Sequence, residues 1–178
     1  MKITRHIFSV IKALLLVTFI TGLALIPATP VHAMTGAGTA INPYIIYDVT
    51  DLQAVNGDLT AYYELNNNID ASETIAWNAG AGFDPIGGNF TGHFDGKGFT
   101  INDLYIYRPT TASAALFGNV GAGATITNTH LVNPMFMGQI TCAGFVVYIT
   151  NATITYCSVT GGVIMNYDTG AHRSLIHI

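Results

Sequence analysis

The stretch Thr125-Ile126-Thr127-Asn128-Thr129-His130-Leu131 is followed by a second copy, Thr153-Ile154-Thr155-Tyr156-Cys157-Ser158-Val159. At the same offset, Ala115-Leu116-Phe117-Gly118 aligns with Ala143-Gly144-Phe145-Val146. A third copy of the first pattern lies upstream, at Thr100-Ile101-Asn102-Asp103-Leu104-Tyr105-Ile106. Self-similarity at a fixed period is typical of repeat proteins, in which one unit cannot bury its hydrophobic face alone.

The repeats predict columns of inward-facing side chains that stack on the next coil, about 4.8 Å away. The expected structural core columns are Ile101, Ile126 and Ile154; Leu104, Thr129 and Cys157; and Ile106, Leu131 and Val159. The alternative is a β-sandwich with chance similarity between its strands. Because three copies share one pattern, we predict an all-β protein, a parallel β-helix (β-solenoid) with coils of about 25–28 residues.

The composition agrees with a β-rich chain. Only 9% of the residues are charged, whereas Thr, Asn, Gly, Ile, Val and Tyr are abundant. β-Branched and aromatic residues favour strands, and Gly and Asn favour the turns between them. Long amphipathic helices are not expected, because Lys, Glu, Gln and Arg are scarce.

The segment before the repeats predicts an N-terminal cap. Strands are expected at 44–47 and 62–65, and a short helix at 48–55, with Thr50 or Asp48 as its N-cap and Asn56-Gly57 as its stop. The end of a solenoid has unpaired strand edges, which such a helix would cover. We assign residues 34–42 to a flexible lead-in, 43–98 to the cap and first coils, and 99–170 to the β-helix repeats.

Residues 1–33 are typical of a secretory signal peptide. Lys2, Arg5 and Lys12 form a basic start, residues 13–26 are apolar, and Val31-His32-Ala33 has the small-x-small form of a cleavage site. The apolar run is shorter than the ~18–20 residues that a membrane span needs. We therefore expect cleavage after Ala33, no membrane span in the mature chain, and a secreted or cell-surface location.

The mature chain is acidic. After removal of residues 1–33, three strong bases (Lys97, Arg108 and Arg173) remain beside ten acids, a net charge of −7. Such a surface repels nucleic acid and anionic lipid, so neither is an expected partner.

Residues 42–162 resemble the GLUG-motif β-helix proteins of bacterial and archaeal cell surfaces. The resemblance rests on an ordered set of pieces: Asn42-Pro43-Tyr44-Ile45-Ile46, Asp51-Leu52-Gln53-Ala54-Val55, Tyr62-Tyr63-Glu64-Leu65, Ile69-Asp70, Phe83-Asp84-Pro85-Ile86-Gly87, Phe90-Thr91-Gly92-His93-Phe94-Asp95-Gly96-Lys97-Gly98 and Leu116-Phe117-Gly118. The family's Gly-Leu-hydrophobic-Gly is degenerate here, as Ala115-Leu116-Phe117-Gly118 and Ala143-Gly144-Phe145-Val146.

The resemblance implies a right-handed parallel β-helix that adheres, displays or spaces at a cell surface. Such modules stand in front of other domains in adhesins and in IgA-cleaving metallopeptidases. No active site is carried over, because the family's motif is structural. The implied partners are a surface glycan or protein and the downstream domains of a longer chain.

We interpret residues 171–178 as a truncated tail.

Residues 94–98, Phe94-Asp95-Gly96-Lys97-Gly98, contain the most conspicuous polar group of the chain. His93 and Asp95 alternate at the end of an expected strand, so together with Asp84 they form an alternative site for proton transfer or cation binding. The structural interpretation is a tight turn in which Gly96 and Gly98 adopt positive φ. We favour the turn, and we also assign Gly118 to a turn.

A polysaccharide-cleaving enzyme, or the N-terminal region of a surface peptidase, is the alternative function. The first would need two converging carboxylates, for which Asp84, Asp95 and Asp103 are candidates. The sequence contains no His-Glu-x-x-His, calcium-loop or Gly-x-Ser-x-Gly motif. We therefore expect a non-enzymatic protein without a metal or cofactor.

Two further features are interpreted as structural. Cys142 and Cys157 are about half a coil apart in the sequence rather than one coil apart, and Cys157 stands in a core column, so free thiols are expected rather than a disulfide. Trp77 is expected to pack in the N-terminal cap and not to serve as a platform for a sugar.

Overall fold

The computed structural model describes residues 34–110, 113–139, 141–166 and 175–176. By its internal contacts the chain divides into two units, Met1–Val31 and His32–Ile178. The first unit and the predicted cleavage site lie outside the described residues, as does much of the predicted tail. Among the described residues, no helix is long and apolar enough to cross a membrane.

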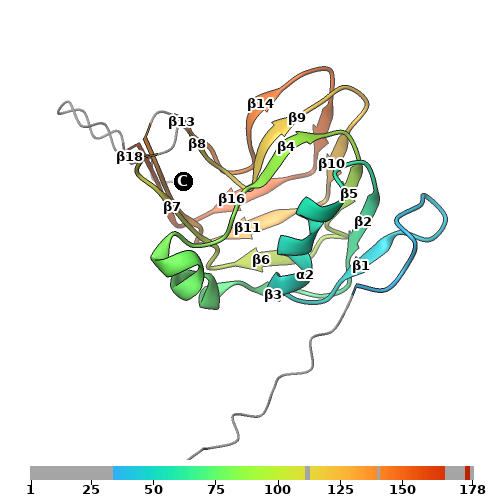
Figure 1. Cartoon of the computed structure of the whole chain (residues 1–178), viewed down its shortest axis with the longest axis horizontal. Coiled ribbons are helices and arrows are strands. Elements are labelled where there is room, and N and C mark those ends of the chain that lie inside the picture. The colour runs from blue at the N-terminus through green and yellow to red at the C-terminus, as the bar shows by residue number, and fades with distance from the viewer. Residues whose placement is uncertain (1–33, 111–112, 140, 167–174, 177–178) are drawn as a thin grey trace, which may run out of the picture. The chain divides into compact units, whose positions relative to one another are not determined.

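The second unit is a parallel β-solenoid, as predicted: successive coils pass through the same sheets in the same order (Figure 1). The first sheet contains β1 (Tyr44–Ile46), β2 (Tyr62–Leu65), β5 (His93–Asp95), β10 (Thr125–Thr127) and β15 (Thr153–Thr155). The second contains β3 (Ile69–Asp70), β6 (Thr100–Asn102), β11 (His130–Val132) and β16 (Ser158–Thr160).

Three further sheets contain the other described strands. One contains β7 (Tyr105–Arg108), β12 (Met135–Gly138), β17 (Val163–Asn166) and β18 (Leu175–Ile176). Another contains β4 (Ile86–Phe90), β9 (Phe117–Val120) and β14 (Val146–Ile149), and the last pairs β8 (Ser113–Ala114) with β13 (Thr141–Cys142). Among the described strands, each ladder is parallel except that of β17 with β18.

The register of the stacked strands differs in part from the predicted columns. Ile126 lies beside Ile154 as expected, but on its other side it pairs with Phe94, and Ile101 pairs with Leu131 in the second sheet. The Thr-Ile pattern at 100–101 therefore lies in β6, in the second sheet, and not in β5, the strand of the first sheet that pairs with β10. Because Thr and Ile are common in β-strands, a two-residue Thr-Ile match does not determine which sheet a strand joins.

The same difference shifts the other two columns. Ile106 pairs with Phe136 and not with Leu131, and Leu104 lies at the corner between β6 and β7, where the next coil has Pro134. The coil from Phe94 to Ile126 is longer than the one from Ile126 to Ile154. The extra residues lie in its first corner, at 96–99, and in the connection between β7 and β8.

Left-handed residues form columns at two corners of the coil. Between the first and second sheets, Lys97, Asn128 and Tyr156 have φ of 54°, 50° and 55°. Between the second and third sheets, the corner residues are Asp103, Asn133 and Gly161, with φ between 51° and 64°. Gly, Asn and Asp are the residue types that tolerate this conformation best, so four of these six corner residues fit their position, and Lys97 and Tyr156 do not.

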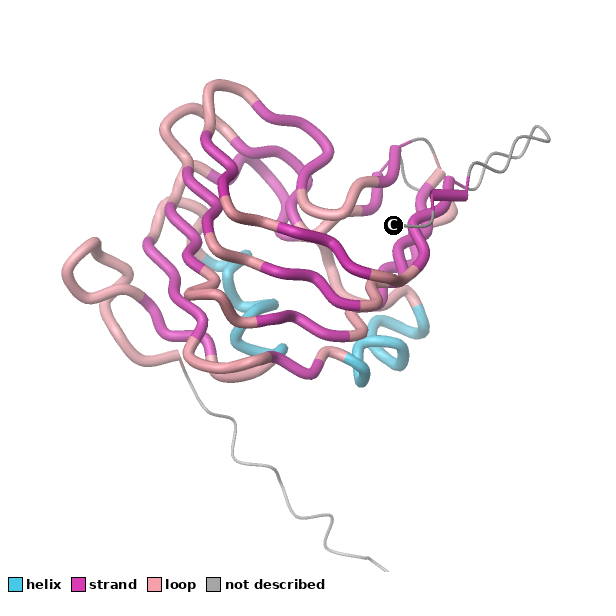
Figure 2. Tube along the Cα trace, turned by 180° about the vertical axis from the view of Figure 1, so that it is seen from behind, coloured by secondary structure: helices cyan, strands magenta, loops and turns pink. Residues whose placement is uncertain are grey.

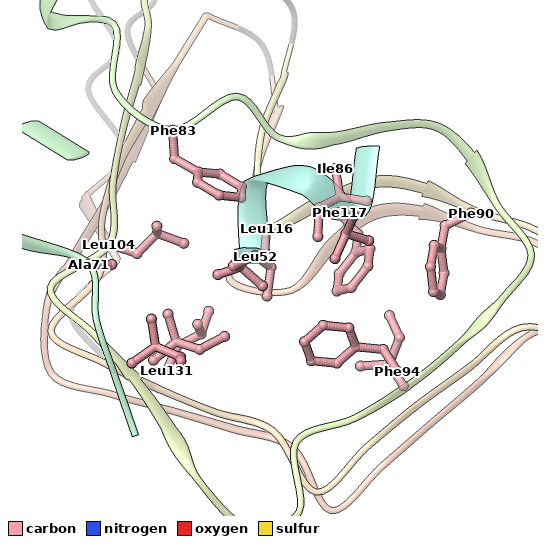
Figure 3. Packing of buried hydrophobic residues seen from close by; sticks show 14 of the residues in the cluster. Leu52, Ala71, Phe83, Ile86, Phe90, Phe94, Leu104, Leu116, Phe117 and Leu131 are labelled. Atoms are coloured by element: carbon pink, nitrogen blue, oxygen red, sulfur yellow. The ribbon is translucent and has the colours of Figure 1, made fainter. Parts of the chain in front are cut away.

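The apolar interior is continuous from coil to coil. Figure 3 shows Leu52 and Leu116 near its centre, with Phe94 and Phe117 to one side and Leu104 and Leu131 to the other. These side chains are completely buried. The rings of Phe94 and Phe117 meet edge to face at 5.6 Å between centroids, a favourable aromatic geometry. No single coil encloses these residues, so the core exists only in the stack.

Helix α2 (Val49–Ala54) lies at the N-terminal side of the solenoid, the end that also holds the other helical segments in Figure 2. Its N-cap is Asp48, one of the two predicted candidates, whose Oδ1 accepts a hydrogen bond from the Asp51 amide at 2.9 Å. Val49, Leu52 and Val55 are buried at three-residue spacing and turn one face of the helix to the interior.

Two segments of 3₁₀ helix, η1 (Val55–Gly57) and η2 (Ser72–Gly80), adjoin the cap. The second is interrupted by non-helical residues at Trp77, Asn78 and Ala79. No sequence pattern at 72–80 predicts η2. Trp77 is partly buried and packs against the core.

The lead-in segment, residues 34–42, is anchored by backbone hydrogen bonds. The Ile45 amide donates to the Thr35 carbonyl at 2.8 Å, and the Tyr62 amide donates to the Gly38 carbonyl at 3.0 Å. These contacts oppose the flexibility that the sequence suggests for this segment. At the other end, β18 is the described part of 171–178.

Two of the three predicted turn glycines have a different environment from the one expected. Gly98 has a φ of 83°, as predicted, but its positive-φ neighbour is Lys97 and not Gly96. Gly96 is required because a Cβ atom there would lie 2.4 Å from the Asn128 carbonyl oxygen. Gly118 lies inside β9 rather than in a turn, since the strand continues to Val120.

Candidate functional site

His93 and Asp95, two members of the alternative site, point outward from β5. The His93 ring stacks on Tyr62 with 4.1 Å between centroids, and its Nδ1 lies 2.7 Å from the Thr125 hydroxyl. These contacts run across three neighbouring strands of the first sheet, which places His93 in a polar ladder on the outer surface of the solenoid.

Asp95 anchors the corner that follows β5. Its Oδ1 accepts hydrogen bonds from the Lys97 amide at 2.8 Å and from the Asn128 side-chain amide at 3.0 Å. The Lys97 ammonium lies 3.8 Å from Asp95 Oδ2 and 3.5 Å from Glu64 Oε2. The first bond makes an Asx turn, and the second ties the corner to the next coil.

Asp84 lies in a different part of the surface. Its carboxylate accepts from Arg108 Nη2 at 3.1 Å, and its backbone amide donates to Gln53 Oε1 at 2.8 Å. It lines a pocket of about 460 Å³ with Gln53, Asn56, Trp77 and Asn78. The structure therefore brings His93 and Asp95 onto one strand, but it does not bring Asp84 to them.

The side-chain amides that line the Asp84 pocket form hydrogen bonds to the backbone of neighbouring loops. Gln53 Nε2 donates to the Asp84 carbonyl at 2.8 Å, Asn56 Oδ1 accepts from the Gly87 amide, and Asn78 Nδ2 donates to the Gly82 carbonyl. These bonds fix loops against the cap. The pocket is consistent with the predicted structural role of Trp77.

Asp95 belongs to a groove that crosses three consecutive coils. Its volume is about 600 Å³ and it is open to solvent. It is lined by Asp95, Lys97, Gly98, Asn128, His130 and Tyr156. The residues come from the corners between the first and second sheets, so the stacking of coils, not one loop, assembles the groove.

Tyr156 is the member of this groove that sequence reasoning missed. It follows β15 with φ of 55°, at the position that Asn128 occupies one coil earlier. Its side chain is 81% exposed. The signal was present in the repeat itself: Tyr156 aligns with Asn128, at a position where a bulky residue in the left-handed region is rare.

The columns of inward-facing apolar side chains reach the surface at the coil that contains β14, β15 and β16. Phe90 and Val120 are buried, whereas Ile149, next in their column, is 52% exposed. We call this apolar surface the end face; it consists of Ile149 and the half-buried Phe145, Val146, Ile154, Cys157 and Val159. In the part of the chain that is described, β14, β15 and β16 are each the last strand of their sheet.

The two cysteines are free thiols. Cys142 Sγ lies 2.9 Å from the Met165 carbonyl oxygen, and Cys157 Sγ lies 3.3 Å from that of Thr155. Partial burial raises the pKa of both thiols. A raised pKa leaves less thiolate at neutral pH, so both groups should react more slowly than a fully exposed cysteine.

The other shifted groups serve turns and the core. The hydroxyl and then the amide of Thr60 hold the pKa of Asp58 below its usual value, and Ser72 does the same for the pKa of Asp70. Such a carboxylate stabilises the fold above its unfolded pKa, and this contribution is lost as the pH falls through the lowered one. Burial raises the pKa of Tyr63, whose hydroxyl donates to the Asp58 carbonyl at 2.6 Å. Within the described residues, no three His, Cys, Asp or Glu side chains gather as a metal site would require.

Over 132 residues, which are 71% of this chain, the sequence is 42% identical to halomucin of Haloquadratum walsbyi (strain DSM 16790 / HBSQ001). The match covers 1% of halomucin, so the chain spans about one hundredth of the length of the curated relative that it matches. No model of a protein family matches the chain, and no solved structure matches it. The resemblance to GLUG-motif proteins therefore stays a prediction.

Proposed function

We propose that this chain is a non-catalytic β-solenoid module of an extracellular or cell-surface protein, in which it spaces, displays or adheres. In this proposal its coils continue into those of a longer polypeptide. We further propose that the chain is a GLUG-type surface module and that its β-helix is right-handed. The observation that carries it is the end face.

The end face is suited to one kind of neighbour, a further coil of the same pattern. Ile154 and Val159 continue columns whose previous members, Ile126 and Leu131, are completely buried. The backbone groups of β15 and β16 on that side are spaced for another parallel strand. A next coil would bury the apolar column and pair both strands without any change of register.

The similarity to halomucin supports a longer chain. A match to about one hundredth of a protein is what a repeated or inserted module gives. The predicted signal peptide supports an extracellular location. Asp84 and Asp95, two of the three carboxylates considered for a polysaccharide-cleaving enzyme, line different pockets, which favours the non-catalytic proposal over that alternative.

Adding one coil tests the proposal. Residues 131–158 are duplicated and inserted after Ser158, which adds one full coil and keeps every column in phase. All cysteines except the original Cys157 are replaced by alanine. The added coil should cover Cys157, so we expect its alkylation by iodoacetamide to slow about tenfold or more, because a buried thiol is both less exposed and less ionised.

The matched control inserts residues 132–158, one residue fewer. Its first strand is shifted by one, which exchanges inward and outward side chains. We expect this variant to leave Cys157 reactive and to unfold at lower urea concentration. Equal reactivity of Cys157 with and without the in-phase coil would reject a stack that continues. Retention of the full-length protein in the cytoplasm of its source cells would reject the extracellular location.

A further inference from the structure

We infer that the groove lined by Asp95, Asn128, His130 and Tyr156 binds a neutral, hydroxyl-rich glycan, with the Tyr156 ring as its platform. This gives the module an adhesive role and rests on the proposed function. The groove lies at the corner between the first and second sheets, and its residues come from three coils.

The conformation of Tyr156 is the first argument. Among the other non-glycine residues with positive φ at the two corners of the coil, Asn128, Asp103 and Asn133 are of types that adopt this conformation readily, and Lys97 makes ion pairs with Glu64 and Asp95. A bulky side chain is disfavoured there, and at 81% exposure Tyr156 recovers little burial in return. Neither the turn nor the core explains an aromatic residue at this position, whereas an exposed aromatic ring that lines a groove is a surface on which a sugar can stack.

The polar groups around the ring are the second argument. Asp95 is held by two hydrogen bonds, and His130 is oriented by the Ser158 hydroxyl, 2.8 Å from its Nδ1. A carboxylate, an amide and an imidazole are thus fixed within one groove. Acceptors and donors that are oriented before binding lose little entropy when they meet sugar hydroxyls.

The charges favour a neutral ligand. Lys97 is the strong base of the groove, and it lies between two carboxylates, those of Glu64 and Asp95. A uronate or sulfate would therefore meet no net positive charge. The groove volume of about 600 Å³ is within the usual range for small-molecule sites.

Saturation-transfer NMR and calorimetry with methyl β-D-glucopyranoside, methyl β-D-galactopyranoside and methyl α-D-mannopyranoside test the inference, with glucuronic acid as the acidic comparison. We expect saturable binding of a neutral hexoside and weaker binding of glucuronic acid. The Tyr156→Asn variant keeps a residue suited to the turn and should bind about tenfold more weakly or worse. Asp95→Asn, which retains the side-chain shape, should also weaken binding.

Tyr148→Asn is the matched control, because Tyr148 is an exposed tyrosine on β14 (59% exposed) outside the groove. Its affinity should equal that of the unchanged protein. Absence of saturable binding for all three hexosides, or equal affinity of the Tyr156→Asn variant, would overturn the inference. Either result leaves the alkylation of Cys157 in the extended chain unaffected, so failure of the glycan site is distinguishable from failure of the stacking proposal.

Discussion

At the corner after β15, Tyr156 departs from the residue preference that most of the other left-handed corner residues follow. Asn128 occupies the same corner one coil earlier, and Asp103, Asn133 and Gly161 occupy the next one around the coil. Their residue types predict their turns from the sequence. Tyr156 does not, because propensity rules describe what the backbone prefers and not what a ligand requires.

Replacing Tyr156 by Asn should stabilise the protein. The change exchanges a disfavoured side chain for one that tolerates positive φ, and it removes little buried surface. We expect the free energy of unfolding to rise by about 1 kcal/mol, measured by urea denaturation followed by circular dichroism. A variant that is less stable than the unchanged chain would show that the Tyr156 ring makes a structural contact, and would weaken the case for the groove.

Helix α2 shows how a short element derives its stability from packing. Its 6 residues, Val49–Ala54, are too few to form a stable helix on their own in water. Asp48 satisfies one amide of its first turn, but the larger contribution comes from Val49, Leu52 and Val55, which are buried where the first coil would otherwise be open. The cap and the helix were predicted from the sequence, because N-cap, apolar spacing and stop signal agree with one another.

Leu52 is the residue on which this element depends most. Leu52→Ala would leave a cavity beneath the helix, and we expect a loss of about 2–5 kcal/mol in the free energy of unfolding. Thr50→Ala, an exposed position of the same helix, should change it by less than about 0.5 kcal/mol. Equal effects of the two changes in chemical denaturation would mean that α2 does not close the core.

The repeat units interact with their nearest neighbours, so the whole molecule behaves as a one-dimensional stack. The sequence predicted this architecture and the coil between Ile126 and Ile154. It misplaced Ile101, because the Thr-Ile of β6 matches that of β10 although the two strands belong to different sheets. It also missed the groove, since residues from three coils meet only once the register is known.

A matched pair of substitutions in one column measures this dependence on neighbours. Ile126 has a coil on each side, whereas Ile154 has one neighbour in its ladder among the described strands. We expect Ile126→Ala to lower the free energy of unfolding by about 2–5 kcal/mol, and Ile154→Ala by roughly half as much. Hydrogen exchange should likewise be faster in β15 than in β10. Similar losses and similar exchange rates would indicate that the last coil is already covered.

The parallel ladders also determine how the molecule would respond to tension. Each coil, such as the one from Ile126 to Ile154, advances the stack by about 4.8 Å, the spacing between paired strands. The same residues, drawn out as a straight chain, reach roughly 95 Å. A coil peeled from the end face would therefore release about twenty times the length that it occupied when wound. A solenoid of many such coils would therefore lengthen under load by unwinding one coil at a time. The released length would limit the force that reaches the rest of the polypeptide.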